Sequence, residues 1–377
     1  MIKRILQDVI EQRFFKGKVI VLLGPRQVGK TTLMEQIRQS PLLAGMQVVM
    51  LNCDEPDDRQ ALTNANSADL AMLVGGAKVL IIDEAQRVQN IGLTVKLLAD
   101  RLKDLQIIVT GSSSLDLANK LNEPLTGRKY EYLLLPVSTQ EIIAQNGMPE
   151  AIRMLESRLI YGSYPDIIFR KDDVRELLMQ LTNSYLFKDI YAMQDVRKPD
   201  LLEKLLVALA LQIGNEVSFN ELAQTIHSDV KTVERYISLL EQTFVIFRLS
   251  GLNRNLRNEL KKAKKFYFYD NGVRNAVLQL FSPLNLRQDA GALWENFFMS
   301  ERLKYNKYNL NFVKSYFWRT QTQQEIDLVE ESDGVFRAYE LKWNTKRRAT
   351  FPESFVNMYK PAENHIITPE NYIQFLI

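Results

Sequence analysis

The first 150 residues predict an α/β domain with a parallel sheet, followed by a helical domain and a second α/β domain. Short runs rich in Val, Ile and Leu alternate with helical patterns in this part, which is typical of a sheet with crossover helices. The chain of 377 residues is also too long for one core, at about 150 residues per domain. We therefore expect domains over residues 1–150, 151–284 and 285–377.

Four apolar runs predict the strands of the first domain. They are short and rich in Val, Ile and Leu, as expected for strands covered on both faces. Helical patterns separate them, so the strands are expected to run parallel. The runs are KVIVLLG at 18–24, QVVMLNC at 47–53, AKVLIID at 77–83 and LQIIVTGS at 105–112.

A glycine-rich loop, GPRQVGKTT at residues 24–32, separates the first strand from a helical pattern. Its spacing matches GxxxxGK[ST], in which glycines let backbone N–H groups surround phosphates at a helix N-terminus. Lys30 is expected to reach the β- and γ-phosphates of a nucleotide, and the Thr31 hydroxyl to bind Mg²⁺. The residues expected to line the phosphates are Gly24, Pro25, Arg26, Gln27, Val28, Gly29, Lys30, Thr31 and Thr32.

Two adjacent acids, Asp83 and Glu84, end the third predicted strand in VLIIDEAQ. Because the carboxyl ends of parallel strands meet at one edge of a sheet, these acids are expected beside the loop. We assign Asp83 to the magnesium ion and Glu84 to the general base that polarises the attacking water. Two neighbouring acids with separate roles indicate hydrolysis of the nucleotide.

Hydroxyl groups follow the fourth predicted strand, in IIVTGSSS at residues 107–114. Thr110, or one of the serines 112–114, is expected beside the γ-phosphate, where it orients the attacking water. The alternative for each hydroxyl is local capping of a strand-to-helix turn. Arg128 is a candidate for the cation that neutralises transition-state charge, either in cis or from a neighbouring subunit of a homo-oligomer.

These motifs resemble those of AAA-type ATPases of bacteria and archaea, in the AAA+ superfamily and related to the MCM and STAND ATPases. The resemblance rests on GPRQVGKTTL, VLIIDEAQ, IIVTGSSS and LTGRKYEYLLLPVSTQEI, and it covers nearly the whole chain. It implies a P-loop NTPase fold, ATP and Mg²⁺ as cofactors, and a sensor role near Thr110. It also implies a winged helix and an endonuclease-like module after the ATPase domain.

A helix-turn-helix pattern is expected in the second domain. Two short helical patterns and an apolar strand follow one another in residues 217–251. Ser218 and Ser228 are expected to cap the two helices, and the order predicts a winged helix-turn-helix. The second helix is expected to bury Val233, Ile237 and Leu240 and to expose Lys231, Thr232, Glu234 and Arg235.

A basic segment from Arg248 to Arg274 is the expected place of contact with DNA. It carries eight basic residues and two acids, although the whole chain has a net charge of only +3. The alternatives are a docking module for another protein and a solvated charge run. Aromatic residues 266–269 are expected in a buried strand rather than on a base-stacking surface. The basic residues are Arg248, Arg254, Arg257, Lys261, Lys262, Lys264, Lys265 and Arg274.

The last domain is expected to begin with the helix ALWENFFMSERLKY and to continue as three strands. Asp327 lies in the second strand, and Glu340 and Lys342 lie two apart in the third, so they face one side of a hairpin. The two acids are expected to bind magnesium, Lys342 to stabilise phosphate charge, and Glu295 to complete the metal shell.

This acid, acid and lysine order resembles the core of PD-(D/E)xK nucleases, which are of the restriction-endonuclease type. Asp327, Glu340 and Lys342 match its three positions. No proline precedes Asp327, and Trp343 follows the lysine, which departs from the common pattern. The alternative is therefore a nuclease-type fold without an active metal site, because such pairs on strands are also common as plain solvated pairs.

The composition is that of an ordinary soluble globular protein, with 46% apolar and 25% charged residues. The single Cys53 excludes an intrachain disulfide and fits a reducing cytosol, and two histidines with one cysteine cannot build a zinc cage. The longest early apolar run, VIVLLG, is too short to span a bilayer. We expect a cytoplasmic protein with no membrane partner.

Together the motifs predict an ATPase that binds and hydrolyses Mg-ATP and acts on, or is regulated by, DNA through its winged helix. One alternative is an ATP-regulated nuclease in defence or repair, which requires Asp327, Glu340 and Lys342. The other is a signalling ATPase whose C-terminal half docks another protein.

Overall fold

The computed structural model describes residues 2–112, 121, 124–170, 172–183, 198–253, 264–346 and 350–377. The chain forms two compact units. The first unit comprises residues 1–135 and 242–244, and the second comprises residues 136–241 and 245–377. No helix in the described ranges is both long and apolar enough to cross a bilayer.

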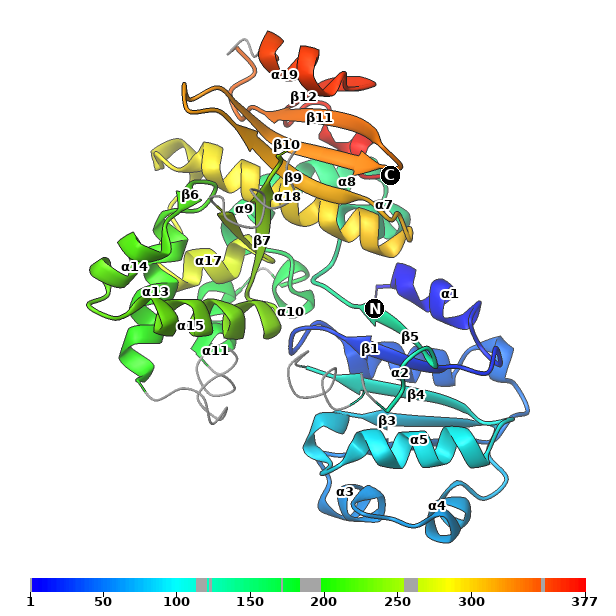
Figure 1. The fold of residues 1–377 in the computed structure, drawn as a ribbon. Helices are drawn as coiled ribbons and strands as arrows, with labels where there is room; N and C mark the ends of the chain where they lie inside the picture. Colours follow the sequence, from blue (N-terminus) through cyan, green and yellow to red (C-terminus); the bar gives the residue numbers. More distant parts are fainter. Residues whose placement is uncertain are drawn as a thin grey trace. The chain divides into compact units, whose positions relative to one another are not determined.

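A five-stranded parallel sheet forms the centre of the first unit (Figure 1). Its strands are β1 (Val19–Leu23), β2 (Val48–Asn52), β3 (Val79–Asp83), β4 (Gln106–Gly111) and β5 (Lys129–Leu133). They lie in the order β2-β3-β4-β1-β5, and all pairs are parallel. The four predicted strands are present. The fifth, β5, is not among them, because its sequence KYEYL mixes charged and aromatic residues and forms no apolar run.

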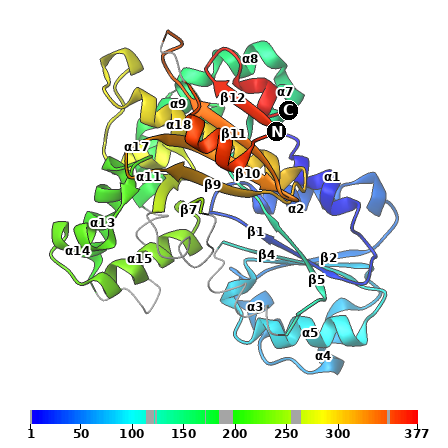
Figure 2. The ribbon, with the colours of Figure 1, turned by 45° about the horizontal axis from the view of Figure 1, so that its top comes forward.

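Helices cover this sheet, as strands buried on both faces require. They are α1 (Ile5–Glu11), α2 (Lys30–Arg38), α3 (Pro56–Leu62), α4 (Ser67–Val74) and α5 (Ile91–Arg101), with 3-10 turns η1 (Pro41–Leu43) and η2 (Ala85–Arg87). Figures 1 and 2 show α3, α4 and α5 together on the side of the unit away from α1. The glycine-rich loop joins β1 to the start of α2, as predicted.

A seven-stranded mixed sheet runs through the second unit. Its strands are β6 (Glu216–Val217), β7 (Ile246–Gly251), β8 (Lys264–Phe268), β9 (Lys314–Arg319), β10 (Glu325–Ser332), β11 (Val335–Leu341) and β12 (Glu363–Ile367). Their order is β12-β11-β10-β9-β7-β8-β6. Because β7 pairs with β9, one sheet extends from the helix-turn-helix region into the C-terminal strands.

The second unit is rich in helices. They are α7 (Thr139–Asn146), α8 (Met148–Arg153), α9 (Leu155–Tyr161), α10 (Pro165–Ile168), α11 (Val174–Thr182), α13 (Pro199–Leu211), α14 (Phe219–Thr225), α15 (Val230–Gln242), α17 (Asn271–Val277), α18 (Ala290–Tyr308) and α19 (Glu353–Tyr359), with η5 (Leu284–Leu286) and η6 (Tyr372–Phe375). The long helix α18 packs against β8 and β11. A buried cluster joins β9, β10 and β11 to Phe355 of α19.

Helices α14 and α15 occupy the predicted helix-turn-helix region. Ser218 caps α14 as predicted, because its side chain accepts a hydrogen bond from a backbone N–H of the first turn. The predicted cap of α15 is wrong. The helix begins one residue later than expected, so Asp229 rather than Ser228 caps it and accepts from the Thr232 N–H at 2.9 Å.

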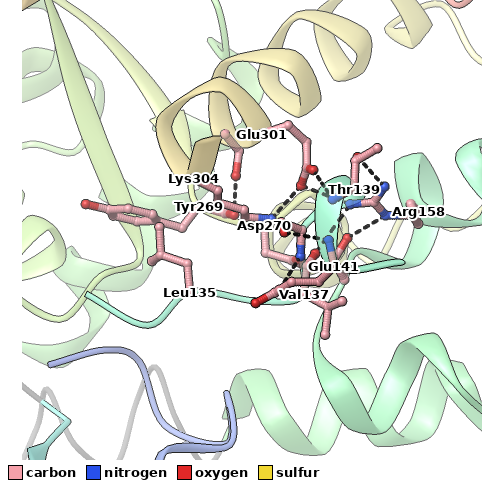
Figure 3. A network of polar contacts seen from close by, with 12 residues as sticks. Leu135, Val137, Thr139, Glu141, Arg158, Tyr269, Asp270, Glu301 and Lys304 are labelled. Carbon is pink, nitrogen blue, oxygen red and sulfur yellow. Dashed lines mark hydrogen bonds and ion pairs between the residues drawn. The ribbon is translucent and has the colours of Figure 1, made fainter. Parts of the chain in front are cut away.

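A buried polar network stabilises the second unit (Figure 3). The guanidinium of Arg158 on α9 is 1% exposed and lies 2.9 Å from the carboxylate of Glu301 on α18. Lys304 donates to the same carboxylate at 2.7 Å, and the Thr139 N–H donates to it at 2.5 Å. Burial acts to raise the pKa of Glu301, but Arg158 and Lys304 outweigh it and lower the pKa to about 2. The network therefore holds residues 137–163 to α18 through ionised groups.

Candidate active site

Residues 24–32 form the loop after β1 and the start of α2, and both glycines of this segment are required by geometry. A Cβ on Gly24 would lie 2.1 Å from the carbonyl oxygen of Leu134, so no larger residue fits beside the end of β5. Gly29 precedes α2 with φ +93° and ψ +31°, a left-handed conformation that glycine adopts without strain. Gly24 is therefore required because a side chain would not fit, and Gly29 because of its backbone conformation.

Lys30 is buried at the centre of this loop, with 4% of its surface exposed. Its ammonium donates to the carbonyl oxygens of Gly24 and Pro25, both at 3.0 Å. The same nitrogen lies 3.8 Å from Oε1 of Glu84. The loop therefore presents a buried cation to one of the two predicted acids.

Asp83 and Thr110 stand at the carboxyl ends of β3 and β4, which are neighbours in the sheet. The buried Asp83 carboxylate accepts a hydrogen bond from Oγ1 of Thr31 at 2.6 Å and another from the Thr110 hydroxyl. The Thr110 hydroxyl in turn accepts from the Glu84 N–H at 3.2 Å. Thr110 thus links the two acids, because β4 lies between the loop strand β1 and the acid strand β3.

Gln86 joins this group and is not among the predicted site residues. Its Nε2 donates to Oε2 of Glu84 at 2.5 Å and to Oγ of Ser112 at 2.9 Å. Glu84 itself has φ +51° and ψ +40°, a conformation that is uncommon for a residue other than glycine and recurs at functional sites. The other two serines considered for this position, Ser113 and Ser114, lie outside the described residues.

Arg4 is a second contributor that no motif signals. The residue is 3% exposed, and its guanidinium donates to the carbonyl of Val28 at 2.7 Å and to that of Leu135 at 2.6 Å. Val28 precedes Gly29 in the loop, and Leu135 follows β5. Arg4 thus holds the end of the loop to the segment that leaves the sheet. Arg4 lies 24 residues before Val28, at the start of helix α1. No sequence motif includes a residue at this distance from the loop, so the sequence alone does not indicate the contact.

Arg128 lies at the opposite edge of the sheet from the loop. It precedes β5, whose residue Lys129 pairs with Val19 at the start of β1, whereas the loop follows the end of β1. A five-residue strand is about 16 Å long, at about 3.3 Å per residue. The Arg128 side chain is 52% exposed and pairs with Asp100. The structure does not bring it to Lys30 in cis, and a role from a neighbouring subunit stays a prediction.

The donor set at the end of β3 fits a magnesium ion. Magnesium prefers hard oxygen ligands, usually a few from the protein together with phosphate oxygens and water. The Thr31 hydroxyl and an Asp83 carboxylate oxygen lie 2.6 Å apart, and Thr31 is exposed to solvent. These two oxygens therefore match the expected protein contribution to a magnesium–nucleotide complex.

The predicted residues of the C-terminal strands also come together, as the hairpin pairing requires. The Lys342 ammonium lies 2.7 Å from Oε2 of Glu340 and 3.8 Å from Oδ2 of Asp327. The Asp327 carboxylate also accepts from the Leu341 N–H at 2.7 Å. Burial, and then the charge of Asp327, raise the pKa of Glu340 to about 7.

Glu295, the fourth residue of the predicted C-terminal set, contacts Tyr267 and Lys265 rather than Lys342. Its Oε1 accepts from the Tyr267 hydroxyl at 2.7 Å and lies 3.5 Å from the Lys265 ammonium. Lys265 also pairs with Glu325 on β10. Burial raises the pKa of Glu295 to about 7, although Lys265 opposes the shift.

This arrangement does not fit a magnesium ion. Each acid already has an N–H, O–H or ammonium partner, whereas magnesium requires near-octahedral oxygen ligands. Within the described ranges, no three side chains of His, Cys, Asp and Glu form a group able to hold a metal ion. The predicted pair of metal ligands, Asp327 and Glu340, is therefore close in space, but both acids are engaged by donors of the chain itself.

The basic segment does not form one exposed face in the part of it that the structure describes. Lys265 and Arg274 are buried, and the partly exposed Arg248 pairs with Glu241. Lys264 places its ammonium over an aromatic ring at 5.1 Å. The local excess of positive charge is thus partly internal. Outside the described residues lie Arg254, Arg257, Lys261 and Lys262.

The two other expectations for this region are confirmed in part. Phe266, Tyr267 and Phe268 lie in the buried strand β8 and are at most 1% exposed, whereas Tyr269 follows the end of the strand and is half-buried. On α15, Val233, Ile237 and Leu240 are buried as predicted, and so are Tyr236 and Leu239. Lys231 and Glu234 are exposed as predicted, whereas Thr232 and Arg235 are half-buried.

Three family models match consecutive parts of the chain. An AAA domain matches residues 16–143. Two domains of unknown function follow, DUF8612 over residues 152–284 and DUF4143 over residues 290–376.

Two relatives match most of the chain, and both are named as uncharacterised proteins. An uncharacterised protein of Mycobacterium tuberculosis is 27% identical over 339 residues, which cover 88% of this chain and 72% of that protein. An uncharacterised protein of Methanocaldococcus jannaschii is 23% identical over 373 residues, which cover 92% of this chain and 80% of that protein.

Among solved structures, AMPPCP-bound DnaA from Aquifex aeolicus has a TM-score of 0.33 at 15% identity and covers 63% of this chain and 86% of its own. The Pif1 helicase from Candida albicans has a TM-score of 0.29 at 15% identity and covers 48% of each chain. Likenesses at this level do not define a common fold. The match over residues 16–143 and the geometry of the loop identify this part of the chain as a P-loop NTPase domain of the AAA type.

Proposed function

We propose that the chain binds Mg-ATP in the first unit and hydrolyses its terminal phosphate bond. The observation that carries this proposal is the meeting of four side chains at one edge of the parallel sheet. Oγ1 of Thr31 lies 2.6 Å from Asp83, and Nζ of Lys30 lies 3.8 Å from Glu84. A cation, an alcohol and two acids at this edge are the groups that phosphoryl transfer to water requires.

Binding of the phosphates falls to the loop. Gly29 immediately precedes α2, and free backbone N–H groups and the helix dipole at such an N-terminus favour an anion. Lys30 exchanges its two carbonyl partners for phosphate oxygens, so the buried ammonium keeps hydrogen-bond partners in both states. Thr31 and Asp83 would hold Mg²⁺, which when bound neutralises charge on the phosphates.

Glu84 is the group we assign to the attacking water. Its carboxylate accepts the proton that the water loses as the new bond to phosphorus forms. Gln86 holds one carboxylate oxygen, and Thr110 receives the backbone N–H, so the acid is oriented before the nucleotide arrives. Such pre-orientation lowers the cost of reaching the reacting geometry.

The test is the variant Glu84→Gln, assayed for phosphate release and for ATP binding. Loss of a general base lowers turnover by about 10² to 10⁴-fold, while the loop and Lys30 still bind the nucleotide. Glu35→Gln is the matched control, because Glu35 is a partly exposed acid on α2 that pairs with Arg38. Turnover that survives Glu84→Gln would remove Glu84 from the mechanism.

We infer that the helix-turn-helix region contacts DNA or receives a signal from it. The order α14, α15, β7 and β8 supports a winged helix, and Lys231 is exposed at the start of α15. The basic segment supports DNA contact less than its sequence suggests, because Lys265 and Arg274 are buried. A gel shift at several salt concentrations tests the inference, because phosphate contacts weaken steeply with salt. No shift at low salt would favour the alternative, a signalling ATPase whose C-terminal half docks a protein.

The nuclease alternative has less support from the described residues. Asp327, Glu340 and Lys342 lie together, and the order α18, β9, β10, β11 agrees with the resemblance to the PD-(D/E)xK core. The acids, however, are engaged with donors of the chain itself. Nuclease activity therefore stays outside the proposed function.

A further inference from the structure

Four acids, Glu295, Glu325, Asp327 and Glu340, form an acid cluster in the C-terminal part of the chain. A lysine from a strand outside this part lies beside two of them. Lys265 belongs to β8, in the helix-turn-helix region, and its side chain is only 2% exposed. Its ammonium lies 3.5 Å from Glu295 on α18 and pairs with Glu325 on β10. Burial opposes a charge on Lys265, yet Glu295 and Glu325 outweigh burial and raise its pKa. The side chain is therefore held as a buried cation.

A second residue of β8 takes part in the same cluster. Tyr267 lies two positions after Lys265, so both side chains point to one face of the strand. Its hydroxyl donates to Glu295 at 2.7 Å. One face of β8 thus supplies both a cation and an O–H donor to the acids.

The remaining acids of the cluster are engaged by a second lysine. Lys342 lies 2.7 Å from Glu340 and 3.8 Å from Asp327. Two ammonium groups therefore face four carboxylates that come from α18, β10 and β11. A divalent ion between these acids would meet a fixed positive charge, which disfavours its entry.

We propose that the ammonium of Lys265 is the resident cation of the cluster formed by Glu295, Glu325, Asp327 and Glu340, in the place where a nuclease-type site would hold a divalent metal ion. The role of the cluster is then structural. It ties β8 to β10, which are separated in the sheet by β7 and β9. Removal of Lys265 should leave an uncompensated group of acids that binds a divalent ion instead.

The test counts bound Mn²⁺ by the electron spin resonance of the free ion, with no nucleotide present. All variants carry Asp83→Asn, which removes an acid of the nucleotide site and leaves the C-terminal cluster intact. We compare this background with added Lys265→Met, and with Lys265→Met together with Glu340→Gln. Lys265→Arg is the conservative variant, because it keeps a positive charge at the same place.

The background is expected to bind no Mn²⁺ at micromolar concentrations, and Lys265→Arg to behave like it. Lys265→Met should gain one bound ion, and the added Glu340→Gln should remove it. The melting temperature of Lys265→Met should also rise with Mn²⁺, whereas that of the background should not.

Two results would overturn the proposal. The first is a bound ion in the background that Glu340→Gln alone removes, since the cluster would then hold metal with Lys265 in place. The second is a folded Lys265→Met variant that gains no ion. If Lys265→Met does not fold, the background with and without Glu340→Gln still decides, because the proposal requires that neither binds Mn²⁺. All of these readouts are independent of ATP hydrolysis.

Discussion

The two acid and lysine clusters of this chain use the same residue types and differ in how these are held. At the end of β3, Asp83 is held by two hydroxyls, and Lys30 rests on carbonyls of a loop whose Thr31 is open to solvent. In the C-terminal cluster, Glu295 and Glu325 share a buried lysine from another strand. A ligand can replace the partners of the first cluster without leaving a buried charge unpaired. In the second cluster it cannot.

From this difference we expect chemistry at the first cluster and a structural role for the second. A buried group that already has fixed partners costs free energy when one of them is removed, and it offers little to a ligand. The network of Arg158 and Glu301 is the extreme case, because both side chains are at most 2% exposed. Substitutions in the closed clusters should therefore change stability, and substitutions at the loop should change turnover.

The largest effect on stability is expected for Glu301→Gln. The change leaves Arg158 and Lys304 without their shared carboxylate in a buried place. Breaking one partner of a buried ion pair costs about 3–5 kcal/mol. Chemical denaturation should show this loss in the free energy of unfolding, with ATP turnover per folded molecule unchanged. A loss of unfolding free energy below about 1 kcal/mol would contradict this, because it would equal the contribution of an exposed ion pair.

The same carboxylate predicts how stability depends on pH. The pKa of Glu301 is lowered to about 2 from the usual 4.5, so the folded state favours its ionised form. The stabilisation is present above pH 4.5 and is lost as the pH falls from 4.5 toward 2. The unfolding free energy of the parent should fall more steeply in this window than that of Glu301→Gln. Equal slopes would show that Glu301 does not titrate in this way.

An intermediate effect is expected at Arg4, which positions the loop. Arg4→Ala removes both hydrogen bonds, to Val28 and to Leu135. A loop displaced by a fraction of an ångström should lower kcat/KM for ATP on the order of 10-fold. The kcat/KM of Arg4→Lys should lie between those of the parent and Arg4→Ala. A lysine keeps the charge but lacks the two N–H groups that reach both carbonyls. Steady-state kinetics should show the change mainly in KM if Arg4 acts on phosphate binding.

The smallest effect is expected for Tyr267→Phe. It removes one hydrogen bond to Glu295 and leaves the ammonium of Lys265 in place. The free energy of unfolding should fall by about 1 kcal/mol, and ATP turnover should not change. A loss of turnover with stability intact would mean that the C-terminal cluster takes part in the ATPase cycle.

Local patterns in the sequence predict much of the fold and of the geometry of the candidate nucleotide site. The four apolar runs form β1 to β4, and the spacing from Gly24 to Thr31 matches the loop that the structure contains. These features depend on neighbours in the chain. The helix cap at Asp229 differs from the prediction by one residue, within the usual uncertainty of helix ends.

Contacts between distant residues could not be predicted in this way. Arg4 reaches Val28 and Leu135 without a motif, and β7 pairs with β9 across more than sixty residues of chain. Lys265 counts as a surface charge in the sequence, yet it is buried against acids from α18 and β10. A residue's charge is visible in a sequence, but its burial and its partners depend on the folded chain.

The central claim is that Lys30 and the loop around Gly29 bind the phosphates of Mg-ATP. Calorimetric titration of the parent with Mg-ATP, beside Lys30→Ala and the exposed control Lys96→Ala, tests this claim most directly. We predict saturable binding to the parent and to Lys96→Ala, and at least about 100-fold weaker binding to Lys30→Ala, since a buried charged donor to phosphate is lost. Absence of binding to the parent, or equal affinity in Lys30→Ala, would contradict the account.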